Sequence, residues 1–538
     1  MHWAETLADR VVERFPDRKE YVCAAGISPS GVVHFGNFRD VMTIVAVGKA
    51  LVRRGKETKL LFSWDDYDRF RKVPAGVDPK FEEHIGKPLS ALPDPHGDTG
   101  ISYAHRFERL FEGAMRELGI TLEYRRQSER YLAGTYDDAI GRAVEHRESI
   151  ARILLDLMSA KAKAAKGIKD DEFIKTYYPV NIYSEFTGKD STEILTYEDG
   201  RFTYRCKETD QEGTVEIGRD HNLKLAWKVD WPMRWAHEGV AFEPAGTDHA
   251  SPGSGFDAGD TIIKPVFSAE PPVHAAYGMV GLQGVAGKMS GSTGIAKSPN
   301  ELLEVYTEPL LKWQYLKRQP KQNFSLVFDT EIFRQYDEFD REIAAHGAGE
   351  LDGARGFALE AAFPEGKMPA VKAGEGGEVR PIPFRQLVAF GQIVQWDEAK
   401  LGELLGSLEL PYDPESVKAR LPRARNWLEN HNPDQLIALL DEPNTEYASR
   451  LSDEAKQRIT ALREKLPEQG DESIAELEAL VYAIPKDPKA PDEENKRRQR
   501  EFFRDVYQLL IGKDTGPRLS TFLWAVDRKK IRNLLAAQ

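Results

Sequence analysis

Cysteine and long hydrophobic runs are both scarce in this sequence. Only Cys23 and Cys206 occur among 538 residues, so no disulfide framework is expected and a reducing, cytoplasmic compartment is favoured. The longest apolar stretch, "VMTIVAVGKALV", is too short to cross a bilayer and contains Lys49. The N-terminal "MHWAETLADRVVERF" lacks the regions of a signal peptide and has the spacing of an amphipathic helix. We therefore expect no association with a membrane.

Positive charge is also in deficit, with 74 Lys and Arg against 87 Asp and Glu and a net charge of −13. This balance disfavours nonspecific binding to nucleic acid, because phosphate contacts need local positive charge. It does not exclude one basic face on a large acidic protein. The clusters "KRRQR" at 496–500 and "DRKKIRN" at 527–533 fit either such a face or an ordinary solvated helix.

The N-terminal part alternates between strand and helix patterns. Residues 19–28 predict a buried strand, residues 37–54 a helix, and residues 59–70 a second strand that ends in acidic residues. Two later strands are expected, one within 239–255 that runs into a Gly/Asp/His loop, and one at 273–284. A strand, a glycine-rich turn, a helix and a strand form a βαβ unit, so the fold class is α/β with a parallel sheet.

A long insertion and a helical C-terminal part complete the chain. The insertion covers residues 69–216; its part 100–168 has helical patterns, and residues 170–216 do not. "TEILTYEDGRFTYRC" predicts a β-hairpin that turns at Asp199-Gly200.

The C-terminal part, 301–538, is expected to be all-α. Ser473 and Glu476, for example, form a capping box at the start of a helix. Residues 345–382 are rich in Gly and Glu and predict loop or irregular structure. The sheet domain is expected in two pieces, 1–68 and 217–300, on either side of the insertion.

Two glycine-rich turns follow predicted strands and suit phosphate. In "GISPSGVVHFGN", His34 and Asn37 stand at the start of the first helix, where free backbone N–H groups and the helix dipole favour an anion. The alternative is a helix-capping Asn beside a structural His. In "KMSGSTG", Lys288 can neutralise a pyrophosphate, and Ser290 and Ser292 let the loop close over it.

Together these motifs resemble a known family. "HFGN" resembles the HIGH motif and "KMSGS" the KMSKS motif of class I aminoacyl-tRNA synthetases. With "SWDDYDRFRKVP", "WKVDWPMRW" and "GTDHASPGSGFD", the set is similar to class I lysyl-tRNA synthetases over about residues 15–300. The resemblance implies a Rossmann-type catalytic domain with a connective insertion, followed by a helical anticodon-binding domain. It also implies a monomer that activates lysine with ATP and transfers it to the 3′ end of tRNA(Lys).

The resemblance also assigns the residues that would act on ATP, which is expected to carry Mg²⁺. His34, Asn37 and Lys288 would be catalytic by stabilising charge on the phosphates. Gly36 would let adenine lie against the backbone, and Asp248 would bind the ribose unless it only forms an Asx-turn. Ser290 and Ser292 would join Lys288 in ATP binding. Gly291 replaces the second lysine of KMSKS, which leaves Lys288 with more of the charge, aided by Lys297.

A lysine pocket needs a carboxylate and aromatic walls. Family positions and the acidic end of the second strand together give a set of candidates: Gly26, Ser28, Asp65, Asp66, Asp68, Trp227, His249 and Tyr277. Each aromatic residue could instead belong to the hydrophobic core. The sequence leaves open which aspartate meets the ε-ammonium group.

No structural zinc is expected, although many relatives carry a zinc ribbon in this insertion. The corresponding places are Ser184 to Thr187 and Cys206 to Thr209 within residues 170–216, and three of the four ligand positions are not cysteine. The hairpin would be held instead by packing of side chains such as Leu195, Tyr197, Phe202 and Tyr204.

Three other functions remain open at this point. A synthetase for glutamate would need a cationic pocket, which the acidic "SWDDYD" opposes. A small-molecule nucleotidyltransferase would not need a helical domain of this size. A catalytically inactive tRNA-binding protein would not need His34, Asn37 and Lys288.

Overall fold

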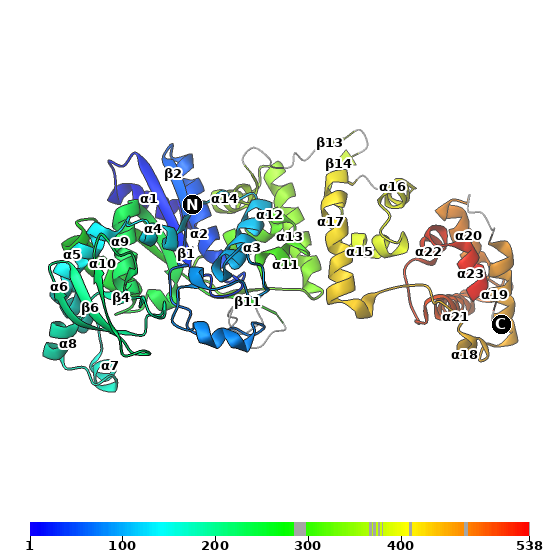
Figure 1. The fold of residues 1–538 in the computed structure, drawn as a ribbon. Coiled ribbons are helices and arrows are strands. Elements are labelled where there is room, and N and C mark those ends of the chain that lie inside the picture. Colours follow the sequence, from blue (N-terminus) through cyan, green and yellow to red (C-terminus); the bar gives the residue numbers. More distant parts are fainter. Residues whose placement is uncertain are drawn as a thin grey trace. The chain divides into compact units, whose positions relative to one another are not determined.

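The computed structural model describes residues 1–283, 297–364, 380–407, 412–466 and 472–536, together with Met368 and the short strands β13 (Ala373–Gly374) and β14 (Gly377–Glu378). The chain divides into two compact units (Figure 1). Unit 1 consists of Met1–Val327 and Glu350–Met368, and unit 2 of Phe328–Gly349 and Pro369–Gln538.

Unit 1 is built on a five-stranded parallel sheet in the order β10-β9-β1-β2-β3. The strands are β1 (Glu20–Ile27), β2 (Glu57–Trp64), β3 (Glu123–Arg126), β9 (Val240–Gly246) and β10 (Val273–Tyr277). The pairing of β1 with β9 joins the two segments of the sheet that the insertion separates in sequence. The predicted α/β class with a parallel sheet is confirmed.

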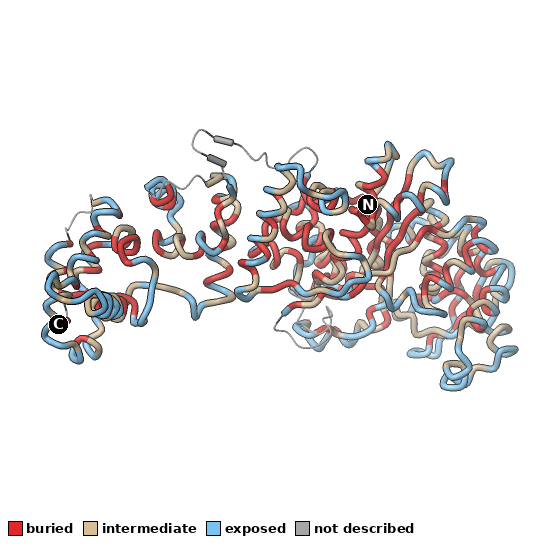
Figure 2. The backbone as a smooth tube through the Cα atoms, turned by 180° about the vertical axis from the view of Figure 1, so that it is seen from behind, coloured by how far each residue is buried: buried red, intermediate tan, exposed pale blue. Residues whose placement is uncertain are grey.

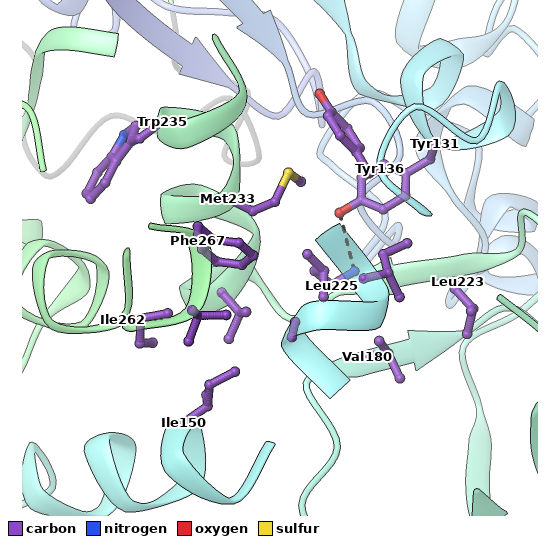
Figure 3. Packing of buried hydrophobic residues seen from close by; sticks show 14 of the residues in the cluster. Tyr131, Tyr136, Ile150, Val180, Leu223, Leu225, Met233, Trp235, Ile262 and Phe267 are labelled. Atoms are coloured by element: carbon purple, nitrogen blue, oxygen red, sulfur yellow. Dashed lines mark hydrogen bonds between the residues drawn. The ribbon is translucent and has the colours of Figure 1, made fainter. Parts of the chain in front are cut away.

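Helices cover the sheet because its central strands are apolar on both faces. Tyr21 to Ala25 of β1 are all buried, as is usual for a parallel strand (Figure 2). Helix α2 (Phe38–Arg53) packs against β1, β2 and β9. Val22 and Ala24 belong to a core shared with α9 (Trp227–Glu238) and α10 (Gly255–Phe267). In that core the Leu225 amide donates a hydrogen bond of 3.3 Å to the Tyr131 hydroxyl (Figure 3).

The other elements of unit 1 surround this sheet. Its helices include α1 (Trp3–Arg14), α3 (Tyr103–Glu117), α4 (Gln127–Leu132), α5 (Asp137–Glu145), α6 (Arg147–Asp156), α7 (Ala160–Ala165), α8 (Asp170–Thr176), α11 (Pro299–Leu303), α12 (Glu308–Leu316) and α14 (Gly353–Ala362). Short 3-10 turns are η1 (Pro79–His84), η2 (Leu89–Ala91) and η3 (Thr247–His249). The smaller strands are β4 (Val180–Ile182), β5 (Thr192–Glu198), β6 (Arg201–Cys206), β7 (Glu212–Glu216), β8 (Leu223–Leu225), β11 (Val280–Leu282) and β12 (Phe324–Leu326).

The expected hairpin is confirmed, since β5 and β6 pair antiparallel on either side of Asp199-Gly200. Both turn residues have positive φ, 47° and 83°, which suits the mirror-image turns that connect twisted strands. Phe202 and Tyr204 are buried as expected, whereas Leu195 is exposed. The hairpin core therefore lies on the face of β6 that carries the two aromatic residues.

Three sequence-based boundaries are wrong. Strand β2 ends at Trp64 rather than at residue 70, because the acidic residues that follow turn into hydrogen-bonded loop structure. Helix α8 lies in the part 170–216 that lacked helical patterns. Helix α14 lies in the part 345–382 expected to be irregular; Asp352 caps its N-terminus through the amides of Ala354 and Arg355.

Unit 2 consists mainly of helices. They are α13 (Glu331–Gly347), α15 (Phe384–Ile393), α16 (Glu398–Ser407), α17 (Pro414–Asn426), η5 (Trp427–His431), η6 (Pro433–Gln435), α18 (Thr445–Ala448), α19 (Asp453–Lys465), α20 (Ile474–Ala483), α21 (Asp492–Ile511), α22 (Leu519–Ala525) and α23 (Arg528–Leu534). The capping box of Ser473 and Glu476 is present at the start of α20. The buried core of unit 2 includes Ile459, Leu462 and Phe502. Within the described ranges, no helix of either unit is long and apolar enough to span a bilayer.

Arg39 ties the first helix of the sheet to a distant loop. It is 3% exposed, and its guanidinium donates hydrogen bonds to the carbonyl oxygens of Gly278 (3.1 Å), Gln322 (2.7 Å) and Gln319 (2.8 Å). Burial lowers the pKa of Arg39 to about 10. The group fixes the start of α2 against the chain that follows β10.

Replacing Arg39 with Met should lower the free energy of unfolding by about 3 kcal/mol, because buried carbonyl groups then lose a charged donor. Thermal unfolding of Arg39→Met beside Arg116→Met, which alters an exposed arginine of α3, measures the difference. Equal transition temperatures for the two variants would contradict this assignment.

Candidate active site at the carboxyl ends of the sheet

Most of the residues predicted to bind lysine lie where the parallel strands end. A cavity of about 450 Å³ lies at the ends of β1, β2, β9 and β10. Its lining includes all but one of the residues expected to bind lysine, namely Gly26, Ser28, Asp65, Asp68, Trp227, His249 and Tyr277. Ligands bind at this edge of open α/β sheets as a rule. We call this space the acidic cavity, because its wall is rich in carboxylates.

A second cavity of about 370 Å³ adjoins the first and is lined by the turn after β1. His34 and Asn37 lie in its wall, together with Arg69, Arg71 and Lys72 from the segment after β2. We call this space the cationic cavity. Ile27, Ser28, Asn37, Asp68 and Arg71 line both spaces.

The turn after β1 presents polar groups to the cationic cavity. The His34 Nδ1 atom accepts a hydrogen bond of 3.1 Å from the Gly36 amide. A Cβ atom at Gly36 would come within 2.8 Å of the His34 ring, so any other residue there would displace that ring. Asn37 precedes α2 and makes no side-chain capping bond. The side-chain amide of Asn37 is therefore available to a ligand. The alternative interpretation, a helix-capping Asn, is not supported.

Two of the predicted aspartates are already paired inside the protein. Asp65 Oδ1 lies 2.6 Å from Arg234 Nη1. Asp68 lies 3.1 Å from Lys224 Nζ and accepts a hydrogen bond of 2.8 Å from the Ser28 hydroxyl. Burial alone would raise the pKa of Asp68, but Lys224 and Ser28 bring it below its usual value. Burial raises the pKa of Asp65 despite the nearby Arg234.

The third predicted aspartate, Asp66, lines neither cavity. It is 2% exposed and accepts a hydrogen bond of 2.8 Å from the Ser128 amide and another from the Ser128 hydroxyl. Burial, partly offset by these bonds, raises its pKa to about 6. Successive residues after a strand point in different directions, and the middle residue of "DDYD" points toward α4.

Asp40 lines the acidic cavity and was not among the sequence candidates. It is 8% exposed, and its Oδ1 atom has no hydrogen-bond partner in the described structure. Burial and the nearby Glu243 raise the pKa of Asp40 well above its usual value, although hydrogen bonds from Gly26 and Tyr277 oppose this. The spacing could have indicated this residue, since Asp40 follows Asn37 by three residues on α2 and so shares its side of the helix.

Helix α9 supplies further residues that the sequence analysis missed. Asp230 and Arg234 form an ion pair of 3.0 Å at i, i+4 spacing. Asp230 also lies 3.5 Å from Lys224 Nζ. Glu243 of β9 accepts hydrogen bonds of 2.8 Å and 2.5 Å from the indoles of Trp231 and Trp235. The motif "WKVDWPMRW" could have indicated these residues, because its Trp residues recur every four positions and its Asp and Arg are also four positions apart.

Aromatic rings stand at the mouth of the acidic cavity. Trp227 is 43% exposed, and the His249 ring meets it edge-on at 5.8 Å between centroids. Asp248 lies in η3 and is exposed. Burial and the charges of Asp40 and Asp248 raise the pKa of Tyr277, so Asp248 lies near the end of β10. Both Asp248 and His249 are thus positioned by the turn that follows β9.

Lys288, Ser290 and Ser292 lie outside the described residues, as does Gly291. Lys297, which was expected to assist Lys288, forms an ion pair of 3.3 Å with Glu301. The carbonyl of Lys297 accepts a hydrogen bond of 3.0 Å from the Phe35 amide. The start of the chain after "KMSGSTG" is thereby fixed beside the turn that carries His34.

The four positions that correspond to zinc ligands lie together. Thr187 Oγ1 lies 3.9 Å from Cys206 Sγ. Burial opposes ionisation of Cys206, but hydrogen bonds from Thr209 and Ser184 outweigh it and lower its pKa to about 6. Hydroxyl groups therefore surround the thiol where a zinc ribbon would have cysteines. Among the described residues, no three His, Cys, Asp or Glu side chains form a metal-binding cluster.

Replacing Arg234 with Met should destabilise unit 1 by about 3 to 5 kcal/mol, because buried carboxylates lose their partner. The loss should be larger at pH 8 than at pH 5. Asp65 already has a raised pKa, which would rise further without Arg234, so protonation at low pH relieves the uncompensated charge. Thermal unfolding at both pH values measures the effect, and a loss independent of pH would contradict the charge pairing.

Comparison with known proteins gives a consistent family. The family model "tRNA synthetases class I (K)" matches residues 1–353. A lysine–tRNA ligase of Streptomyces coelicolor is 36% identical, and the alignment covers 99% of this chain and 98% of the ligase. A lysine–tRNA ligase of Pyrococcus horikoshii is 34% identical, covering 98% of each chain. A solved glutamate tRNA ligase from Elizabethkingia meningosepticum aligns with this chain at 12% identity and a TM-score of 0.44, over 97% of this chain and 99% of the ligase.

The matched region contains the whole parallel sheet, both cavities and the segment with "KMSGSTG". The similarity to the two ligases covers 99% and 98% of this chain, and so it includes the helical unit. This chain belongs to the class I tRNA synthetases (K).

Proposed function

We propose that this chain is a cytoplasmic lysine–tRNA ligase. It activates lysine with ATP to lysyl-adenylate and transfers the lysyl group to the 3′ end of tRNA(Lys) for translation. The observation that carries the proposal is the pair of adjoining cavities of opposite charge at the carboxyl ends of the sheet. A cationic amino acid fits the acidic cavity, and a triphosphate fits the cationic one. The names of the similar ligases support the same substrate.

The acidic cavity has more carboxylates than internal cations. Its carboxylates are Asp40, Asp65, Asp68, Asp230 and Glu243. Lys224 and Arg234 are the cations that pair with them, and their contacts are to Asp65, Asp68 and Asp230. Asp40 forms no ion pair with any described residue, and one of its oxygens is unsatisfied. Asp40 is therefore the partner of the lysine ε-ammonium, with Tyr277 beside it.

The other lysine-binding residues surround the aliphatic part of the substrate. Trp227 and His249 cover the mouth, and Gly26 allows close approach to the end of β1. Ser28 and Asp68 stand at the border with the cationic cavity. A glutamate side chain would bring its own negative charge beside Asp40 and Glu243, two buried carboxyl groups without an ion pair among the described residues. The acidic cavity thus disfavours glutamate as the substrate.

The phosphates of ATP bind in the cationic cavity. His34 and Asn37 donate to phosphate oxygens, Gly36 allows the adenine to approach, and Asp248 binds the ribose hydroxyls. Lys288, Ser290 and Ser292 complete the phosphate contacts from the "KMSGSTG" segment. Mg²⁺ arrives with ATP, since this ion prefers phosphate oxygens and water to all-protein sites.

Activation needs positioning and charge stabilisation rather than a base. The lysine carboxylate, already ionised at neutral pH, attacks the α-phosphorus. The bond from that phosphorus to the bridging oxygen breaks, and pyrophosphate leaves with the electron pair. His34, Asn37 and Lys288 stabilise the charge that develops on the leaving group. The ribose hydroxyl of the tRNA 3′ end then attacks the carbonyl of lysyl-adenylate and releases AMP.

The parts of the chain divide this work. Residues 1–68 and 217–300 form the catalytic domain, and residues 69–216 form the connective insertion, with its zinc-free hairpin region at 170–216. Residues 301–538 form the helical stem and anticodon-binding domain. The chain acts as a monomer on one tRNA.

Lysine should drive exchange of labelled pyrophosphate into ATP, assayed with and without tRNA(Lys), and the other standard amino acids should not. Lys288→Ala should reduce the rate by about 10² to 10³-fold, because a charge-stabilising group is lost at the leaving pyrophosphate. Exchange with another amino acid would overturn the substrate. No exchange with any amino acid, even with tRNA present, would overturn the ligase function.

Asp40→Asn should raise the KM for lysine about 100-fold, because the ε-ammonium loses its charged partner. Asp66→Asn should leave that KM within about threefold, since Asp66 faces Ser128. The wild-type KM should also rise as the pH falls through the raised pKa of Asp40, because the protonated carboxyl no longer attracts lysine.

Steady-state exchange kinetics between pH 5 and pH 8 measure both effects. The pH-dependent rise should be absent from Asp40→Asn. A larger KM increase in Asp66→Asn than in Asp40→Asn would reverse the assignment of the ε-ammonium partner.

A further inference from the structure

The segment after β2 brings an unusual concentration of positive charge to the ATP side. Arg69, Arg71 and Lys72 all line the cationic cavity. The carboxylate in the same lining is Asp68, which already contacts Lys224 at 3.1 Å. The cavity therefore has a surplus of cations before any substrate enters. An anion with several charges would complete it.

Arg71 differs from Arg69 in pairing and from Lys72 in position, although burial, which raises the pKa of Asp190, is opposed by the charges of both Arg69 and Arg71. Arg69 forms an ion pair of 3.3 Å with Asp190, whereas Arg71 is exposed and forms no ion pair with any described residue. Lys72 lines only the cationic cavity, whereas Arg71 lines both cavities. Among the described residues, Arg71 is the cation from this segment that stands at the boundary where lysine and ATP would meet.

The backbone around Arg71 is held firmly. The Phe70 amide donates to the Lys87 carbonyl at 2.7 Å, and the Gly86 amide donates to the Phe70 carbonyl at 2.9 Å. The Phe70 side chain is 1% exposed in a core with Leu89 and Tyr103. Because Phe70 is anchored on both its backbone and its side chain, the following residue starts from a fixed position. The backbone of Arg71 is thereby positioned beside the cavity, while its exposed side chain can turn toward a ligand.

We propose that Arg71 is a further catalytic residue of the activation step, which binds the α-phosphate of ATP where the lysine carboxylate attacks it. This inference rests on the proposed function and adds a residue to it. A guanidinium can donate two parallel hydrogen bonds to phosphate oxygens. Placed at the boundary, it would contact a non-bridging oxygen of the α-phosphate and the oxygen that bridges to the β-phosphate.

The role of Arg71 follows from where negative charge develops during the activation step. The carboxylate oxygen forms a bond to the α-phosphorus as the bond to the bridging oxygen breaks. Negative charge grows on that bridging oxygen and leaves with pyrophosphate, and no proton is transferred. Arg71 stays protonated and stabilises this growing charge. Gly291 stands where KMSKS has a second lysine, and Arg71 would supply a positive charge to the leaving group from another segment.

The test compares Arg71→Ala and Arg71→Lys with Lys80→Ala, which changes an exposed lysine of η1 outside both cavities. Lysine-dependent exchange of pyrophosphate into ATP is measured with saturating tRNA(Lys). Arg71→Ala should lower kcat about 100-fold, Arg71→Lys should restore part of it, and Lys80→Ala should match the wild type. Calorimetric binding of lysine and the unfolding temperature should change little in all three variants, which separates catalysis from a structural role.

The outcomes separate the two proposals. Wild-type protein without lysine-dependent exchange would overturn the ligase function itself. Active wild type with unchanged kcat in Arg71→Ala would overturn only the role of Arg71. A variant with unchanged kcat but weaker tRNA binding in a filter assay would also overturn that role, because the cation would then serve a tRNA phosphate. A loss of lysine binding equal to the loss of kcat would assign Arg71 to the amino acid instead.

Discussion

The buried guanidinium of Arg234 pairs with two carboxylates, Asp65 after β2 and Asp230 on its own helix. Burial works against the charge of Arg234, but these carboxylates raise its pKa well above the usual value. Lys224 plays the same part for Asp68 and Asp230. Without these cations, a wall of buried carboxylates could not stay ionised beside a substrate. The pairs allow the cavity to be acidic and stable at once.

The same ion pairs leave two carboxyl groups of the acidic cavity without an internal cation. The internal cations contact Asp65, Asp68 and Asp230, while Glu243 is held by two indoles and Asp40 keeps an unsatisfied oxygen. The acidic cavity is thus short of one or more cations, and the adjoining cavity has cations in surplus. Lysine and ATP carry the complementary charges, and in the proposed function their reacting groups would meet at the boundary. Selection of the substrate and catalysis of its activation would then depend on one arrangement of charges.

The sequence predicted those features that local patterns determine. Strand and helix periodicity located β1, α2 and the hairpin turn at Asp199-Gly200. Motif resemblance selected His34 and Asn37, which line the cationic cavity, and seven residues that line the acidic cavity. Where a side chain points after a strand ends is not a local property. For this reason Asp66 was grouped with Asp65 and Asp68, although its partner is Ser128, 62 residues later. Asp40 was missed because its importance depends on what Lys224 and Arg234 neutralise elsewhere, which only the folded arrangement reveals.

The central claim is that uncompensated negative charge in the acidic cavity selects a cationic side chain. Calorimetric titration of the wild-type protein with lysine and with norleucine, in the presence of a non-hydrolysable ATP analogue and tRNA(Lys), tests it most directly. Norleucine keeps the aliphatic chain and lacks the ε-ammonium. The account predicts that lysine binds at least about 100-fold more tightly, as expected for loss of a buried charged partner. Equal affinities would contradict it, because shape rather than charge would then determine the choice of amino acid.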